Sequence, residues 1–208
     1  MERERITISI KKDLLNQIDQ IIDGVSVRNR SHAFETLALK SLGSHSRHAI
    51  ILLGGDNATK AVPATISFLN MLAENGFDKV TLALGFLGNK IKSQLSNEKI
   101  KIKYDFLEES NGSGGALLNL KKDLKDTFIV FNSTEKLKIS LDQLLEFHRK
   151  HQSIATIATT DLESMEGVYV FEPSVFKYIP EGFSLLEENT LPQIIKDGEA
   201  VVMPLEII

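Results

Sequence analysis

The sequence has no cysteine among its 208 residues. This absence excludes disulfide bonds and thiolate metal sites, and it agrees with a reducing compartment. No terminal apolar segment approaches the length of a signal sequence or a membrane span, and the first five residues are mostly charged. We therefore expect a cytoplasmic protein that does not associate with a membrane.

An excess of positive charge is also lacking, since the formal net charge is -4. This balance argues against a protein that is basic all over, so any contact with nucleic acid must be local. Basic residues do gather in the first 30 positions, at Arg3, Arg5, Lys11, Lys12, Arg28 and Arg30. An apolar content of 42% is ordinary for a globular protein, and the length allows a small module plus one medium domain.

The stretch before residue 11 alternates between apolar and polar residues. Isoleucine occupies positions 6, 8 and 10, and polar residues lie between them. This period of two predicts a strand with one apolar face. No second strand follows within hairpin distance, and a lone strand leaves both edges unpaired. We therefore expect pairing with the same strand of a second chain, in a homodimer or a higher homo-oligomer.

Two helices are expected after this strand. The first carries apolar residues from Leu14 to Ile22 and ends at Gly24, and the second begins after Asn29 and stops at Gly43. The strand, the first helix and the Asn-Arg-Ser opening at 29–31 resemble the ribbon-helix-helix DNA-binding domains of small bacterial and archaeal repressors. The resemblance covers about the first 43 residues.

That resemblance implies that the paired ribbon enters the major groove of double-stranded DNA and that the second helix binds a phosphate. The DNA-binding residues that it implies are Arg3, Arg5, Thr7, Ser9, Asn29, Arg30 and Ser31. The alternative is a ribbon that serves only to dimerise the chain.

Residues 44–48 are predicted to be a polar linker. From residue 49 the pattern alternates between buried-type strands and helices, which predicts a mostly parallel sheet covered by helices on both faces. Strands are expected at 49–53, 79–84, 100–106, 127–131, 153–160 and 168–171. Helices are expected at 63–75, 89–95, from about 115 to 124, at 141–151, and near Val175 and Leu191. His45 and His48 have no further ligands beside them, so no metal site and no cofactor are expected.

Two glycine-rich loops follow strands of this sheet, at residues 54–57 and 111–115. Ligands of such sheets bind at the carboxyl ends of the strands, where glycine permits close approach. The candidate nucleotide-binding residues are Gly54, Gly55, Asp56, Gly112, Ser113, Gly114 and Asn132. The alternative is that these glycines only form turns. The charged pair at 187–188 is expected to be solvated surface.

Several motifs in order resemble the sugar-phosphate nucleotidyltransferases, from residue 49 to the end of the chain. They are I-I-L-L-G-G at 50–55, L-G-F-L-G-N-K-I at 84–91, E-S-N-G-S-G-G-A-L at 109–117, L-L-E-F-H-R-K-H at 144–151 and G-V-Y-V-F-E-P at 167–173. The resemblance implies a Rossmann-like α/β/α sandwich of the nucleotide-diphospho-sugar transferase type over 49–208. It also implies that the first glycine loop wraps a nucleoside triphosphate and that the second contacts the base.

Three departures from that family fall on its chemistry. The basic segment after the first glycine loop is missing, and Asn132 stands at the start of the loop where the family has its magnesium-binding aspartate. The sugar-binding region has shrunk to residues 161–166. A metal site without carboxylates is a poor site for Mg²⁺. We therefore expect a domain that has lost catalysis.

The sequence thus predicts a DNA-binding transcriptional regulator whose larger domain senses a ligand, such as a nucleotide or nucleotide sugar, or drives oligomerisation. One alternative is an active sugar-phosphate nucleotidyltransferase that the small module dimerises, with relocated carboxylates at Asp56, Glu135 and Asp161. Another is a structural assembly protein.

Overall fold

The computed structural model describes residues 6–22, 24, 27–42, 48–54, 59–77, 79–85, 88–95, 100–107, 111–132 and 134–205. Contacts divide the chain into two compact units, Met1–Ser46 and Arg47–Ile208. The boundary between them lies within the predicted linker. No helix in the described ranges is long and apolar enough to cross a membrane.

The first unit contains the two expected helices, α1 (Lys12–Gln20) and α2 (Arg30–Leu42). Asn29 caps α2, because its side-chain oxygen accepts a hydrogen bond of 3.0 Å from the backbone N–H of His32. The Arg30 guanidinium makes two hydrogen bonds of 2.7 Å to the Asp19 carboxylate and so joins the helices. Residues 6–10 form no strand within one chain. The ribbon needs a second chain and stays a prediction.

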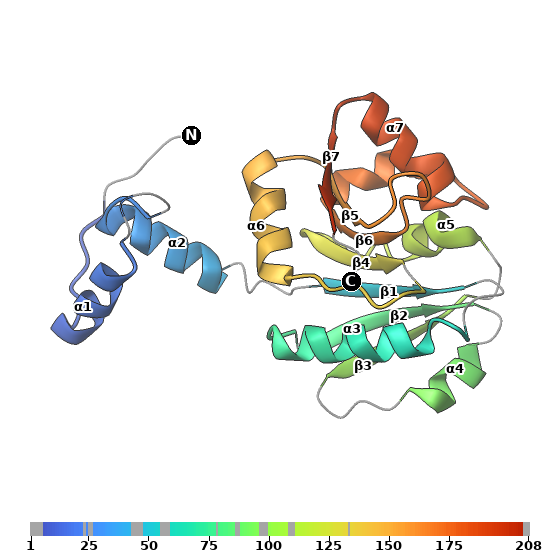
Figure 1. Ribbon diagram of the computed structural model, residues 1–208, viewed down its shortest axis with the longest axis horizontal. Coiled ribbons are helices and arrows are strands. Elements are labelled where there is room, and N and C mark those ends of the chain that lie inside the picture. Colours follow the sequence, from blue (N-terminus) through green and yellow to red (C-terminus); the bar gives the residue numbers. More distant parts are fainter. Residues whose placement is uncertain are drawn as a thin grey trace. The chain divides into compact units, whose positions relative to one another are not determined.

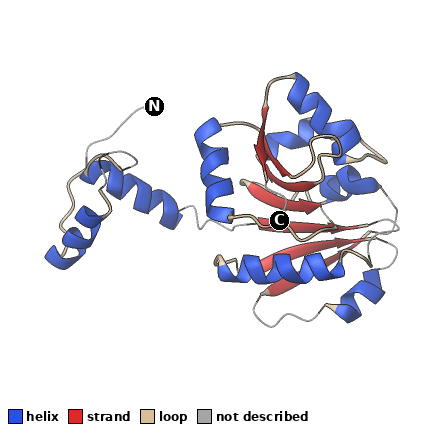
Figure 2. Cartoon of the chain, viewed as in Figure 1, coloured by secondary structure: helices blue, strands red, loops and turns tan. Residues whose placement is uncertain are grey.

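The second unit is built on one sheet of seven strands, in the order β3-β2-β1-β4-β6-β5-β7 (Figures 1 and 2). The strands are β1 (His48–Leu53), β2 (Lys79–Leu84), β3 (Lys101–Phe106), β4 (Phe128–Asn132), β5 (Ala155–Thr159), β6 (Gly167–Phe171) and β7 (Ala200–Pro204). β6 runs antiparallel to both of its neighbours, and the other pairs are parallel. The mostly parallel sheet is confirmed.

Helices cover both faces of the sheet, as expected. The helices are α3 (Val62–Glu74), α4 (Gly88–Gln94), α5 (Gly112–Asn119), α6 (Leu141–His151), the 3-10 helix η1 (Pro173–Lys177), the π-helix η2 (Leu186–Thr190) and α7 (Leu191–Lys196). Alternate strand residues point to opposite faces. One core packs α3, α4 and α6 against the sheet, and the other packs α5, η1, η2 and α7.

Two expectations about local structure were wrong, and one strand was missed. The glycine stretch at 111–115 is not a free loop, because residues 112–115 form the first turn of α5. That helix ends at Asn119 and not near residue 124. β7 was not predicted, since its Ala-Val-Val-Met sequence has no alternation and its half-buried side chains are all apolar.

Candidate ligand site at the carboxyl edge of the sheet

The first part of the candidate site is the edge where β1 and β2 end. Gly85 follows β2, and its N–H donates a hydrogen bond of 3.0 Å to the carbonyl of Leu53. A Cβ added to Gly54 would have no atom within 4 Å, and one added to Gly85 would lie 3.5 Å from the Gly54 Cα. Among the described residues, the atoms nearest to an added Cβ at Gly85 are therefore backbone atoms, and none lies within 4 Å of an added Cβ at Gly54. The predicted residues Gly55 and Asp56 lie outside the described residues.

The second part is a polar cluster at the end of β4, centred on the carboxylate of Glu187. Its Oε1 accepts hydrogen bonds from the amide of Asn132, at 2.6 Å, and from the hydroxyl of Tyr169, at 2.5 Å. Its Oε2 lies 3.4 Å from the hydroxyl of Ser113. The cluster thus joins β4, β6 and the first turn of α5 through one side chain of η2.

Burial fixes the protonation state of the tyrosine in this cluster. Tyr169 is fully buried, and burial followed by the negative charge of Glu187 raises the pKa of its hydroxyl group far above the usual range. The hydroxyl therefore stays protonated and acts as a donor. Its other neighbour is the carbonyl of Met165, at 2.8 Å.

The surroundings of the cluster are acidic. Burial raises the pKa of the Glu166 carboxyl group, and so do the negative charges of three other carboxylates: Glu187, Glu135 and Asp161. Within the described residues, no group of three or more histidine, aspartate or glutamate side chains could hold a metal ion. The side chain at the end of β4 is an amide engaged by Glu187, so the described edge offers hydrogen bonds and no metal-binding carboxylate cluster.

The glycines of α5 pack against another segment of the same chain. A Cβ on Gly112 would lie 2.2 Å from the carbonyl oxygen of Ser184, and one on Gly114 would lie 2.5 Å from its hydroxyl oxygen. The N–H of Gly114 donates a hydrogen bond of 2.9 Å to the same carbonyl. These two glycines are therefore required by the approach of residues 182–184, whether or not a ligand also binds there.

The shortened connection between β5 and β6 is a tight turn with its own hydrogen bonds. The hydroxyl of Thr159 lies 2.7 Å from the carbonyl of Glu166, and the Asp161 carboxylate accepts a bond of 2.9 Å from the N–H of Glu163. That backbone N–H, with the hydroxyl of Ser164, lowers the pKa of the Asp161 carboxyl group. The turn holds Asp161 on the same edge as Asn132.

The structure brings some of the predicted residues together. Ser113 and Asn132 meet through Glu187, whereas Gly54 lies at the end of β1. Sequence reasoning missed Tyr169, and it wrongly assigned Glu187 to the solvated surface. No sequence signal separates Glu187 from the exposed Glu188, because the distinction depends on the π-helix.

The predicted DNA contacts fall in the first unit. Thr7, Ser9 and Ser31 are exposed, whereas Arg3 and Arg5 lie outside the described residues. Arg30 pairs with Asp19, which raises the pKa of its guanidinium group.

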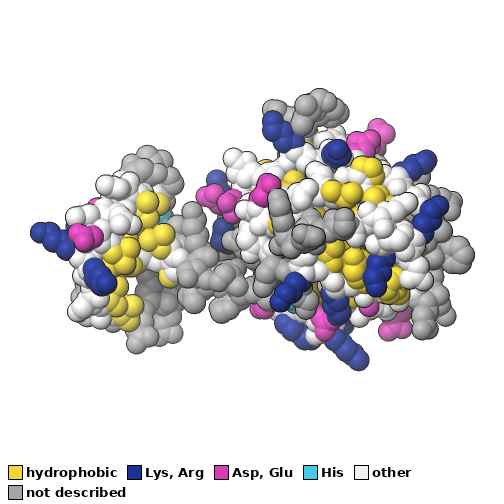
Figure 3. All heavy atoms as spheres, turned by 90° about the horizontal axis from the view of Figure 1, so that it is seen from below, with side chains coloured by type: hydrophobic (Ala, Val, Ile, Leu, Met, Phe, Trp, Pro, Cys, Tyr) yellow, Lys and Arg dark blue, Asp and Glu magenta, His cyan; other side chains and the backbone are white. Residues whose placement is uncertain are grey.

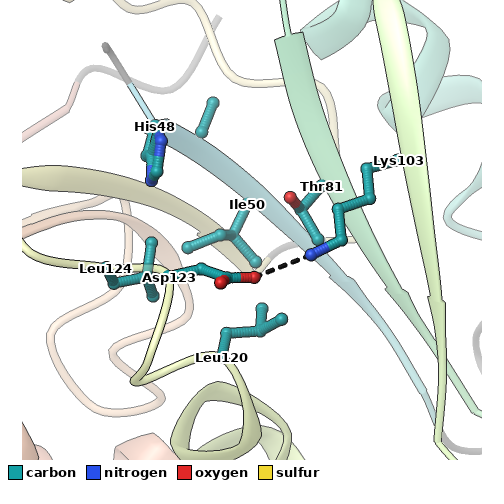
Figure 4. A pocket seen from close by; sticks show the side chains of 8 residues that line it. His48, Ile50, Thr81, Lys103, Leu120, Asp123 and Leu124 are labelled. Atoms are coloured by element: carbon teal, nitrogen blue, oxygen red, sulfur yellow. Dashed lines mark hydrogen bonds and ion pairs between the residues drawn. The ribbon is translucent and has the colours of Figure 1, made fainter. Parts of the chain in front are cut away.

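A small pocket lies apart from the candidate site, toward the amino ends of β1, β2 and β3 (Figure 4). Its wall includes His48 and Thr81, and the ammonium group of Lys103 pairs with the carboxylate of Asp123 at 2.7 Å. Its volume of about 20 Å³ is enough for roughly one water molecule. The pocket is too small for a nucleotide.

Comparisons with known proteins agree on the class of the second unit. The chain is 25% identical over 212 residues to mannose-1-phosphate guanylyltransferase of Mycobacterium tuberculosis, covering 77% of this chain and 59% of that protein. It is 31% identical over 99 residues to the bifunctional protein GlmU of Methanococcus maripaludis, covering 48% of this chain and 22% of that protein. No family model matches the chain. The chain spans about half the length, or less, of these relatives.

Solved structures show the same fold. HddC from Yersinia pseudotuberculosis, complexed with GMP-PN, aligns with a TM-score of 0.59 and 17% identity, over 78% of this chain and 92% of that one. A UDP-glucose pyrophosphorylase complexed with UDP-glucose aligns with a TM-score of 0.56 and 12% identity, over 77% of this chain and 90% of that one. Most of the chain is therefore similar in sequence to sugar-phosphate nucleotidyltransferases and has the same fold as the solved structures, as the sequence motifs implied. The comparisons give no support for a DNA-binding domain.

Proposed function

We propose that residues 48–205 bind a nucleotide sugar, or the nucleoside triphosphate from which one is made, at the carboxyl edge of the sheet. The observation that carries this proposal is the exposed backbone at Gly54, where no described atom lies within 4 Å of an added Cβ. Edges of this kind let phosphates approach backbone N–H groups closely. The relatives of this domain are sugar-phosphate nucleotidyltransferases, which supports the same class of ligand.

This proposal replaces the DNA-binding regulator as the main function. The comparisons favour the alternative expectation, a nucleotidyltransferase, because the similar proteins are of that class. The carboxyl edge also provides separate places for the two halves of a nucleotide sugar. Gly54 exposes backbone for phosphates, and the cluster around Asn132 offers amide, hydroxyl and carboxylate groups for hydroxyl-rich ligands.

Calorimetry with a panel of ligands tests the proposal. The panel is GTP, UTP, GDP-mannose and UDP-glucose, each with and without magnesium. We expect at least one member to bind the wild-type protein, and Gly54→Val to weaken that binding because its side chain fills the open space. Thr81→Val, which introduces the same residue on β2 at the small pocket away from this edge, is the control and should bind as wild type does. Failure of the whole panel, or equal binding by Gly54→Val, would refute the proposal.

A second proposal concerns the first unit, which we propose associates with the same unit of a second chain. Of its described side chains, only Ile18 and Ala33 are buried, at 4% and 0% exposure. Ile6 and Ile8 are 75% and 54% exposed, and hydrophobic side chains gather on this unit in Figure 3. A unit of about 40 residues whose described side chains form so small a core needs a partner for stability. Contact of the polar ribbon face with duplex DNA remains a proposal that depends on this dimer.

A further inference from the structure

Residues 181–190 form a segment that we call the strap, which leads into α7 and packs on the first turn of α5. The N–H of Ser184 donates to the carbonyl of Asn111 at 3.0 Å, and the N–H of Leu186 donates to the hydroxyl of Ser113 at 2.8 Å. The strap carries Glu187 into the polar cluster at the end of β4. It therefore covers the part of the carboxyl edge that lies beside Asn132.

We propose that Glu187 is a latch that holds the strap closed over this part of the edge, and that the sugar of a nucleotide sugar opens it by taking over the hydrogen bonds of Glu187. The inference rests on the proposed function of this edge. It adds a step of regulation, because the ligand must compete with a side chain of the protein itself.

The contacts of Glu187 are hydrogen bonds that a ligand hydroxyl group can take over. All three of its partners are neutral, namely the amide of Asn132, the hydroxyl of Tyr169 and the hydroxyl of Ser113. Among the described residues, no cation forms an ion pair with this carboxylate, and the negative charge of Glu187 raises the pKa of Glu166, so these two carboxylates repel each other. The closed strap is therefore held by hydrogen bonds from neutral groups, while the carboxylates of Glu187 and Glu166 repel each other.

The strap also contains features that oppose closure. Within the described residues, the fully buried hydroxyl groups of Ser184 and Thr190 have no hydrogen-bond partner. A buried polar group without a partner costs free energy. The last five residues of the strap form the π-helix η2. Such helices are rare, and they are found frequently at functional sites. These costs bring the open and closed states nearer in free energy.

The groups that an open strap leaves behind select the ligand. Asn132 and Tyr169 donate hydrogen bonds, and the carbonyl of Met165 beside Tyr169 is an acceptor. A sugar hydroxyl both donates and accepts, and it carries no charge. A phosphate would be repelled by Glu166 and Asp161. The sugar is therefore placed beside Asn132, and the phosphates are placed toward the exposed backbone of Gly54.

Hydrogen exchange without ligand tests the latch. In Glu187→Ala, the amides of residues 182–190 should exchange about tenfold faster or more than in wild type, because hydrogen bonds to a charged group are lost. Glu188→Ala removes the exposed neighbour from the same π-helix and should leave exchange unchanged. If Glu187→Ala does not fold, Glu187→Gln and Asn132→Ala serve in its place. Equal exchange in the Glu187 and Glu188 variants would overturn the latch.

Binding of GDP-mannose, GDP and mannose to the same proteins tests the displacement. Release of the latch raises the fraction of competent protein, so Glu187→Ala should bind GDP-mannose about tenfold more tightly than wild type and Glu188→Ala do, with little change for GDP. Equal affinity of wild type and Glu187→Ala for GDP-mannose would overturn the displacement. If none of the proteins binds any of the three compounds, the proposed function and the displacement both fail. The hydrogen-exchange result then decides by itself whether Glu187 holds the strap closed.

Discussion

The Nε2 atom of His148 lies 3.1 Å from the carboxylate of Glu172, at the edge of the sheet opposite Asn132. Its Nδ1 lies 2.8 Å from the hydroxyl of Thr156, and Glu172 also accepts a bond of 2.7 Å from Thr127. His148 is buried and belongs to α6, so these contacts fasten that helix to β5 and β6. The hydrogen bond from His148, assisted by that from Thr127, lowers the pKa of the Glu172 carboxyl group.

A lowered pKa in the folded state makes stability depend on pH. The stabilisation is present above the pKa that Glu172 has in the unfolded chain, and it is lost as pH falls through the folded-state value. Glu172→Gln should therefore lower the free energy of unfolding at neutral pH and have a smaller effect in acid. Urea unfolding at the two pH values measures this difference. Glu146→Gln, an exposed change on α6, is the control, and equal effects of Glu172→Gln at both pH values would contradict the account.

Substitution of two glycines with similar backbone angles distinguishes the cost of a left-handed backbone from the cost of a steric clash. Gly112 has φ of 71° and Gly198 has φ of 72°, but only at Gly112 would a Cβ meet another backbone group, at 2.2 Å. Gly198→Ala should cost about 1 kcal/mol from the left-handed angle alone. Gly112→Ala should cost roughly 1–3 kcal/mol more, because the Ser184 carbonyl must move. Chemical unfolding of both variants checks this, and equal costs would mean that the strap does not pack on α5 as described.

The exposed apolar face of the first unit yields a prediction about assembly. Ile8→Glu places a charge on the proposed dimer face and should shift the protein toward monomer in sedimentation experiments. Thr7→Glu changes the opposite face of the same strand and should leave the oligomeric state unchanged. A wild-type monomer at all concentrations would refute self-association through this unit.

A random pool of DNA duplexes that yields no enriched sequence would refute the proposal that the polar face reads DNA.

Much of the second unit could be predicted from the sequence. Strands such as 79–84 and the helix at 141–151 agree with the structure because their apolar residues follow the expected periods. The seventh strand could not be predicted, since its short apolar sequence has no period and its pairing with β5 joins segments more than 40 residues apart.

The candidate site was harder to predict, because its key contacts are distant in sequence. Asn132 was selected for its place at a strand end, and its position is as expected. Its partner Glu187 lies 55 residues later, on a π-helix that has no recognised sequence signal. The same limit applies to Gly112 and Gly114, whose contact with Ser184 depends on how residues 182–184 return to α5.

Catalysis can be examined directly. Purified protein with magnesium, a nucleoside triphosphate and a sugar 1-phosphate should release no pyrophosphate above background, because the side chain at the end of β4 is the neutral amide of Asn132, which is engaged by Glu187. Turnover that is lost on changing Asp161 to Asn, and kept on changing the exposed Glu163 to Gln, would contradict this expectation. It would establish the active nucleotidyltransferase instead.

The most direct measurement of the central claim is a nuclear magnetic resonance titration of the labelled protein with GDP-mannose and UDP-glucose. The account predicts that backbone amide shifts change at Gly54, Gly85 and Asn132, which lie along the carboxyl edge of the sheet. Thr81 and Lys103, on the pocket at the other end of the strands, should not change. Saturable changes confined to Thr81 and Lys103, or no changes with either nucleotide sugar, would contradict the account.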